Sequence, residues 1–179
     1  MKPDDLPPRA AAEAARKQFD STMHMLAAAI DVCTDEVWRG TYLGFSFPVW
    51  YQVYHAAYFV DFWFRDAYDG SDWRIMAFDA RIPPEYEHEL PASILVTREE
   101  MRAYLAGIKV KTGRIFDSLH DGLLSRPIIA GRSDHTYLDM IMGQVRHVMY
   151  NVGYLNAVFR SLGMQESDWY AYNEQAAGS

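Results

Sequence analysis

One stretch near the carboxyl end constrains the fold of this chain more than any other. Between residues 134 and 162, apolar side chains recur at alternating steps of three and four residues for seven steps. The stripe consists of Leu138, Ile141, Val145, Val148, Val152, Leu155, Phe159 and Leu162. This spacing places the side chains on one side of a long α-helix, which must bury them against other helices. Ser133 predicts the N-cap of that helix and Gly163 its end.

Helical periodicity also marks residues 8–33, 47–68 and 98–119. Ser46 is the expected N-cap of the second segment, with Pro48 in its first turn. Ahead of the third segment, Thr97 and Glu100 have the spacing of a capping box. Residues 34–38 predict a single helical turn.

No stretch of the sequence alternates with the period of two that marks a half-buried strand. The connection over residues 69–96 is long and holds three prolines, Pro83, Pro84 and Pro91. Four long helices with one extended connection predict an all-α four-helix bundle, with the long crossover between helices two and three.

A chain of 179 residues suits a single domain. We expect a flexible N-terminus over 1–7, the bundle over 8–163 and a C-terminal extension over 164–179. Cys33 is the single cysteine, which excludes an internal disulfide. The net charge of -7 argues against a nucleic-acid partner.

The chain holds no run of 18 apolar residues that would span a membrane. The first ten residues, MKPDDLPPRA, lack the apolar stretch of a signal peptide. We therefore expect a cytoplasmic protein.

Aromatic residues make up 15% of the chain and gather in the run PVWYQVYHAAYFVDFWF. Such residues bring large buried areas, and tyrosine and tryptophan add a polar group that needs a partner. The run is consistent with a bulky helix core, an oligomer interface or a ligand pocket.

Two histidines share helix faces with residues expected inside the bundle. His55 lies on the face of Tyr51, Tyr58 and Phe62, so its ring is expected to point inward. The other four histidines, for which we predict no function, are His24, His88, His120 and His135.

On the last predicted helix, Gln144, His147 and Asn151 fall within about 60° of one another, beside the apolar stripe. Burying such groups unpaired costs about 1–3 kcal/mol each, so they must be hydrogen-bonded or bind something. Spacing alone does not separate these two interpretations.

The run QVRHVMYNVGYLNAVFRSLG resembles the last helix of the DinB/YfiT-like superfamily, which typically reads H-x-x-x-H-x-G-Q before a leucine-arginine-glycine stretch. His147 matches the first histidine and Gly153 the glycine, whereas Asn151 replaces the second histidine and Tyr154 the glutamine. Upstream, CTDEVWRGTYLGFSFPVWYQVYHAAYFVDFWF is similar to the family's first loop and second helix, with His55 at the position of its histidine.

This resemblance implies a divalent metal ion (zinc, nickel, manganese or iron) near His55, His147 and Asn151. An amide oxygen is a weaker donor than imidazole. Gln144 would orient His147 as a hydrogen-bond partner. Asp61, the nearest carboxylate, lies off the His55 face and is not favoured as a ligand.

The resemblance further implies a metal-dependent enzyme, either a transferase or isomerase that uses a low-molecular-weight thiol or a hydrolase, and a homodimer. No general base can be named from the sequence. A second interpretation is a metal-free bundle that binds a small molecule or serves as an interaction module. A third is a structural bundle in which the polar groups bond each other. The expected substrate-binding residues are Trp50, Tyr51, Tyr58, Gln144 and Tyr154.

Overall fold

The computed structural model describes residues 7–65, 82, 90, 93–129, 133–167 and 169. Within these ranges the regular structure is helical and no strand occurs, so the all-α prediction is confirmed. The predicted crossover over 69–96 lies largely outside the described residues. The helices are α1 (Ala10–Val32), α2 (Asp35–Arg39), α3 (Val49–Trp63), α4 (Arg98–Ser118), α5 (Asp121–Leu124) and α6 (Tyr137–Ser161).

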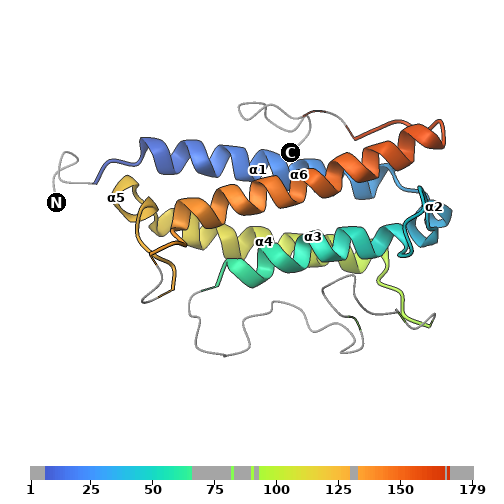
Figure 1. Ribbon diagram of the computed structural model, residues 1–179, viewed down its shortest axis with the longest axis horizontal. Coiled ribbons are helices and arrows are strands. Elements are labelled where there is room, and N and C mark those ends of the chain that lie inside the picture. The colour runs from blue at the N-terminus through green and yellow to red at the C-terminus, as the bar shows by residue number, and fades with distance from the viewer. Residues whose placement is uncertain are drawn as a thin grey trace.

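The long helices lie along a common axis, with α2 at one end and α5 at the other (Figure 1). Helix α6 packs against α1 and α3, and α4 packs against the same two helices. Helix α3 therefore has α6 on one side and α4 on the other, which decides where its polar side chains point. None of the described helices is long and apolar enough to cross a membrane.

The starts of α4 and α6 are fixed by capping boxes. Thr97 accepts a hydrogen bond from the backbone of Glu100, whose carboxylate accepts one from Thr97 N at 2.7 Å, as the sequence predicted. Helix α6 begins later than predicted, and Ser133 is not its N-cap. Thr136 and Asp139 form a complete box three residues further on, because their side chains satisfy each other's backbone donors.

Helix α3 is shorter than its aromatic run. Its N-cap is Pro48 rather than Ser46, and it ends at Trp63, before the predicted end at residue 68. The cause lies in the core, where Phe64 leaves the helix to be fully buried. Its ring centroid lies 4.8 Å from that of Phe19 in α1 and 5.7 Å from that of Phe116 in α4.

The apolar stripe of α6 forms part of the core, but not over its whole predicted length. Leu138 and Leu162 at its two ends are each 42% exposed. Gly163 ends the helix with a φ of +68°, a conformation that favours glycine. The fully buried members are Ile141, Val148, Val152, Leu155 and Phe159.

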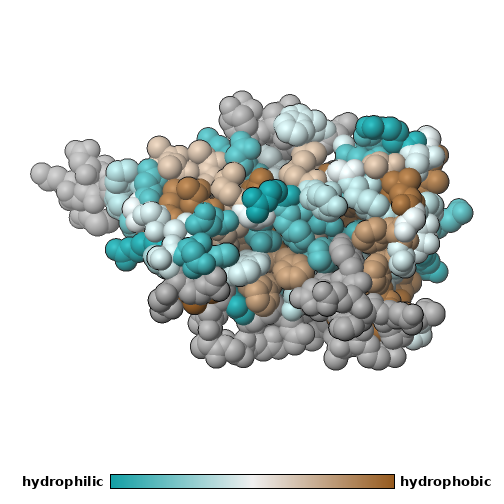
Figure 2. Space-filling view, in the orientation of Figure 1, coloured by the Kyte–Doolittle hydropathy of each residue, from teal (hydrophilic) through white to brown (hydrophobic). Residues whose placement is uncertain are grey.

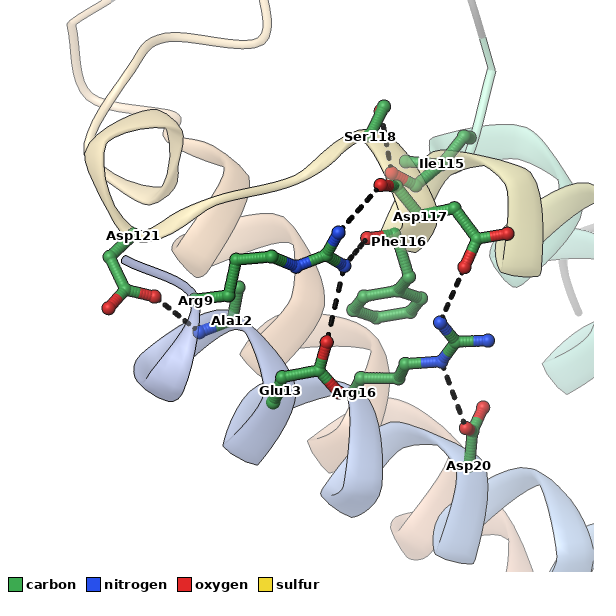
Figure 3. Close-up of polar contacts among 10 residues, drawn as sticks. All are labelled: Arg9, Ala12, Glu13, Arg16, Asp20, Ile115, Phe116, Asp117, Ser118 and Asp121. Atoms are coloured by element: carbon green, nitrogen blue, oxygen red, sulfur yellow. Dashed lines mark hydrogen bonds and ion pairs between the residues drawn. The ribbon is translucent and has the colours of Figure 1, made fainter. Parts of the chain in front are cut away.

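At one end of the bundle, the first residue of α5 caps the start of α1, and the residue before α1 caps the end of α4 (Figure 3). The Asp121 carboxylate accepts a hydrogen bond of 2.9 Å from Ala12 N in the first turn of α1. In the other direction, the Arg9 guanidinium donates to the backbone oxygens of Phe116 and Asp117, both at 3.0 Å, in the last turn of α4. Ala12 N in the first turn of α1 and the Asp117 oxygen in the last turn of α4 have no partner within their own helices.

Candidate metal centre

Two histidines from neighbouring helices meet in the bundle. His55 lies on α3 and His147 on α6, and both are half-buried. Their Nε2 atoms are 3.0 Å apart, and the two rings meet at an interplanar angle of 67°. The structure thus brings together two of the three predicted metal ligands, which are 92 residues apart in the chain.

Phe59 forms an apolar wall beside this pair, and the sequence analysis missed it. Its ring centroid lies 5.0 Å from that of His55 and 5.5 Å from that of His147, edge-on in both cases. Phe59 is four residues after His55, so helical spacing was a signal that could have identified it.

His147 is held in its neutral form. Burial, and after it the neighbouring His55, together lower the pKa of its imidazole to about 4. At neutral pH one ring nitrogen of His147 therefore carries a free lone pair. Its Nδ1 atom is buried and has no hydrogen-bond partner among the described residues.

Two amide side chains share the inner face of α6 with His147. Asn151 is only 3% exposed, and its Nδ2 donates to the backbone oxygen of His147 at 2.9 Å. Gln144 is 7% exposed, and its Oε1 is buried with no partner in the described part of the chain. Gln144 therefore does not bond the His147 ring, contrary to the orienting role expected from the sequence.

The four aromatic residues predicted to bind substrate lie in different surroundings. Trp50 and Tyr51 are core residues, 2% and 0% exposed. Tyr58 is half-buried and is in ring contact with Phe59 and others on α3. Tyr154 donates its hydroxyl proton to the backbone oxygen of Tyr42 at 2.9 Å and so ties the loop before α3 to α6.

Asp61 points away from the histidine pair, towards α4. It is fully buried, and its Oδ2 accepts a hydrogen bond of 2.9 Å from the Tyr104 hydroxyl. Lys111 Nζ donates to its Oδ1 at 2.6 Å and to its backbone oxygen at 2.7 Å. Burial and the Asp61 charge both raise the pKa of Tyr104, which stays protonated as the donor.

The other histidines that the structure describes do not join the pair. His24 is exposed, as predicted, and His120 precedes α5. His135 lies before α6 rather than in its first turn, because the helix starts later, and it stacks on Trp63 with ring centroids 5.2 Å apart. His88 lies outside the described residues.

The candidate donor set is therefore two imidazoles and one amide. In the ranges that the structure describes, no group of three His, Cys, Asp or Glu side chains could hold a metal ion. Two nitrogens that each lie about 2.1 Å from a shared ion are about 3.0 Å apart at a right angle and about 3.4 Å apart at the tetrahedral angle. The observed separation of 3.0 Å fits the first arrangement.

These features define an all-α protein with a half-buried histidine pair between two neighbouring helices. A family model described as the DinB superfamily matches residues 18–155, a range that includes both histidines. The chain belongs to the DinB superfamily. Comparisons with curated proteins and with solved structures gave no significant match.

Proposed function

We propose that this chain binds one divalent metal ion through His55 and His147. The observation that supports this most directly is the 3.0 Å separation of the two Nε2 atoms, which face each other from α3 and α6. The lowered pKa of His147 supports it too, because a metal ligand must be deprotonated and this ring is neutral at pH 7.

Asn151 is the proposed third donor. The carbonyl Oδ1 is the proposed donor atom, because the Nδ2 donates to the backbone oxygen of His147. An amide oxygen binds zinc, nickel or iron more weakly than a third imidazole would. We therefore expect weaker metal binding than a three-histidine set would give.

The proposed activity is a metal-dependent transfer or isomerisation that uses a low-molecular-weight thiol, or a hydrolysis. Membership of the DinB superfamily supports this class. When bound, the ion would lower the pKa of a coordinated water or thiol towards neutrality. His55 and His147 would hold it, and the ring of Phe59 would limit access of water from one side.

Metal titration followed by elemental analysis tests the proposal. Wild-type protein purified without chelators should bind close to one zinc, nickel, manganese or iron per chain. His147→Ala should lose that binding because it removes one of two imidazoles, whereas His24→Ala, an exposed histidine on α1, should keep it. Asn151→His should raise metal affinity at least about tenfold, because it supplies a third imidazole.

Two results would contradict the proposal. One is wild-type protein that binds metal no more tightly than His147→Ala does. The other is an unchanged titration for Asn151→His, which would show that residue 151 does not share a site with His147.

A metal-free bundle that binds a small molecule or serves as an interaction module is the second candidate. The observation that favours it is that, in the ranges the structure describes, no third His, Cys, Asp or Glu side chain joins His55 and His147 in a group that could hold a metal ion. The Nε2 separation also suits a direct hydrogen bond between the two imidazoles. In that case His147→Ala would lower the melting temperature and change no metal binding.

We also propose a homodimer. Leu138 and Met142, one turn apart on α6, are 42% and 45% exposed. Figure 2 shows hydrophobic residues in separate groups among hydrophilic ones on the face in view. Sedimentation at micromolar concentration should give about twice the chain mass of 20.6 kDa, and Met142→Glu should shift it to one chain. A monomer for the wild-type protein would contradict this.

A further inference from the structure

A pocket of about 250 Å³ lies between α2 and the start of α4, and neither histidine of the pair lines it. Its lining combines charged side chains with an apolar surface. The volume is below the roughly 300–1,000 Å³ of sites for drug-sized ligands, so it suits a smaller molecule.

The apolar part of the pocket is rigid. Trp38 on α2 is only 2% exposed, and its Nε1 donates to the backbone oxygen of Val96 at 2.8 Å. That bond fixes the indole against the segment that leads into α4. Leu95 in the same segment is half-buried and also lines the pocket.

Two of the three arginines in the lining are already paired. Arg98 bonds Asp35 with two nitrogens, the shorter contact being 2.7 Å, and also donates to the backbone oxygen of Cys33 at 2.6 Å. Arg102 pairs with Asp31 at 2.7 Å. These positive charges are balanced and their side chains are held in place.

Two other charged residues in the lining are Arg39 and Glu99. Both are exposed, both line the pocket, and neither forms a hydrogen bond or ion pair with the other or with anything else in the described part of the chain. The pocket therefore presents one uncompensated cation and one uncompensated anion beside an apolar surface. A molecule with both charges and a short apolar group would complement all three.

We propose that this pocket binds the zwitterion of a small aliphatic α-amino acid. The Arg39 guanidinium pairs with the carboxylate, for which its planar fork of N–H donors is suited. The Glu99 carboxylate pairs with the ammonium group, and the aliphatic side chain packs on Leu95, beside the buried Trp38. This assignment does not depend on metal binding at the histidine pair.

Calorimetric titration of the full chain with three probes tests the proposal. Leucine carries both charges, isocaproate carries the carboxylate alone, and isoamylamine carries the ammonium alone. Leucine should bind at least about tenfold more tightly than either of the others, because only leucine engages both Arg39 and Glu99.

Charge-removing variants assign each half of the ligand. Arg39→Gln should weaken leucine binding about tenfold and leave isoamylamine unchanged, whereas Glu99→Gln should weaken leucine binding and leave isocaproate unchanged. Arg114→Gln, at an exposed arginine further along α4, is the matched control and should change neither. All three variants should melt like the wild-type protein, because the residues are exposed.

Absence of saturable leucine binding overturns the proposal. Isocaproate binding as tightly as leucine also overturns it, because that result would assign Arg39 to a simple anion site. Equal losses of leucine binding in Arg39→Gln and Arg114→Gln would show a general charge effect rather than a site.

Discussion

Helix α3 carries two inward-facing polar groups, the fully buried Asp61 and the half-buried His55, whose surroundings differ in hydrogen bonding. Asp61 is fully buried, and each of its carboxylate oxygens accepts a hydrogen bond, from Lys111 at 2.6 Å and from Tyr104 at 2.9 Å. Nearer the start of the same helix, His55 meets His147, whose Nδ1 has no partner among the described residues.

This difference separates a structural cluster from a candidate site. The Asp61 carboxylate is buried together with its hydrogen-bond partners, and the cluster links α3 to α4. Because both carboxylate oxygens accept hydrogen bonds within the protein, the cluster is not suited to binding a ligand. On α6, His147 Nδ1 and Gln144 Oε1 are buried without partners among the described residues, at a free-energy cost that the Asp61 cluster avoids. Removing one group at a time from each cluster tests this comparison.

The largest effect is expected for Asp61→Ala. It leaves the Lys111 ammonium, which is only 13% exposed, without its partner, and should lower the free energy of unfolding by about 3–5 kcal/mol. Urea denaturation measures the change. Asp117→Ala is the control, because Asp117 pairs with Arg16 at the surface and is 68% exposed, so its loss should cost less than about 1 kcal/mol. Equal losses of unfolding free energy in Asp61→Ala and Asp117→Ala would show that the buried ion pair matters no more than the surface one.

Tyr104→Phe should have the next largest effect. It removes the hydroxyl donor to a buried carboxylate oxygen and should cost about 1–3 kcal/mol in urea denaturation. Tyr154→Phe removes a half-buried hydroxyl that bonds the Tyr42 backbone, and should cost about 1 kcal/mol. If Tyr104→Phe lowers the free energy of unfolding no more than Tyr154→Phe does, the hydrogen bond to the buried Asp61 contributes no more stability than the half-buried bond of Tyr154.

Protonation of His147 at acid pH should lower the free energy of unfolding of the metal-free protein. Its pKa falls from the ordinary 6.5 to about 4 on folding, so the unfolded chain binds this proton first. The contribution to stability is complete above pH 6.5 and is lost as the pH falls from 6.5 towards 4. After a discount for partial exposure, we expect a loss on the order of 1 kcal/mol.

Urea denaturation across this pH range measures the slope. His147→Gln should flatten it relative to the wild-type protein, and His24→Gln, at an exposed position, should leave it unchanged. A wild-type slope that survives in His147→Gln would assign the acid sensitivity to other groups.

The smallest change is expected for Gln144→Leu. Because the Oε1 of this buried side chain has no partner in the described part of the chain, an apolar residue of similar size should change the free energy of unfolding by less than about 0.5 kcal/mol or raise it. The expected sign is thus opposite to that at Asp61. A loss above about 1 kcal/mol would show that Gln144 is paired in solution.

Much of the fold was predictable because its signals are local. The capping box of Thr97 and Glu100 was recognised and lies where the sequence placed it. The prediction of Ser133 as the cap of α6 is wrong, because Thr136 and Asp139, which have the same spacing as the pair before α4, form the capping box. The early end of α3 was not predictable from periodicity, since it follows from the burial of Phe64 against other helices.

The candidate site was predictable in part for the same reason. His55 and His147 were identified from helix faces and from the family pattern, and the structure brings them together. The partners of Asp61 lie on α4, 43 and 50 residues away, and no spacing along α3 reveals them. Orphaned atoms such as Gln144 Oε1 are likewise a property of packing in three dimensions.

The capping of α1 by Asp121, the first residue of α5, has a consequence for synthesis on the ribosome. The Asp121 carboxylate that bonds Ala12 N is encoded 109 residues after it. At roughly 5–20 residues per second, about 5–20 s pass before that carboxylate has been added to the nascent chain. Over that interval the first turn of α1 depends on water for its amide hydrogen bonds. The apolar side of α1 cannot pack against α6 until later still, because α6 is translated after Asp121. Final docking of the first helix is therefore one of the last events in the folding of this protein.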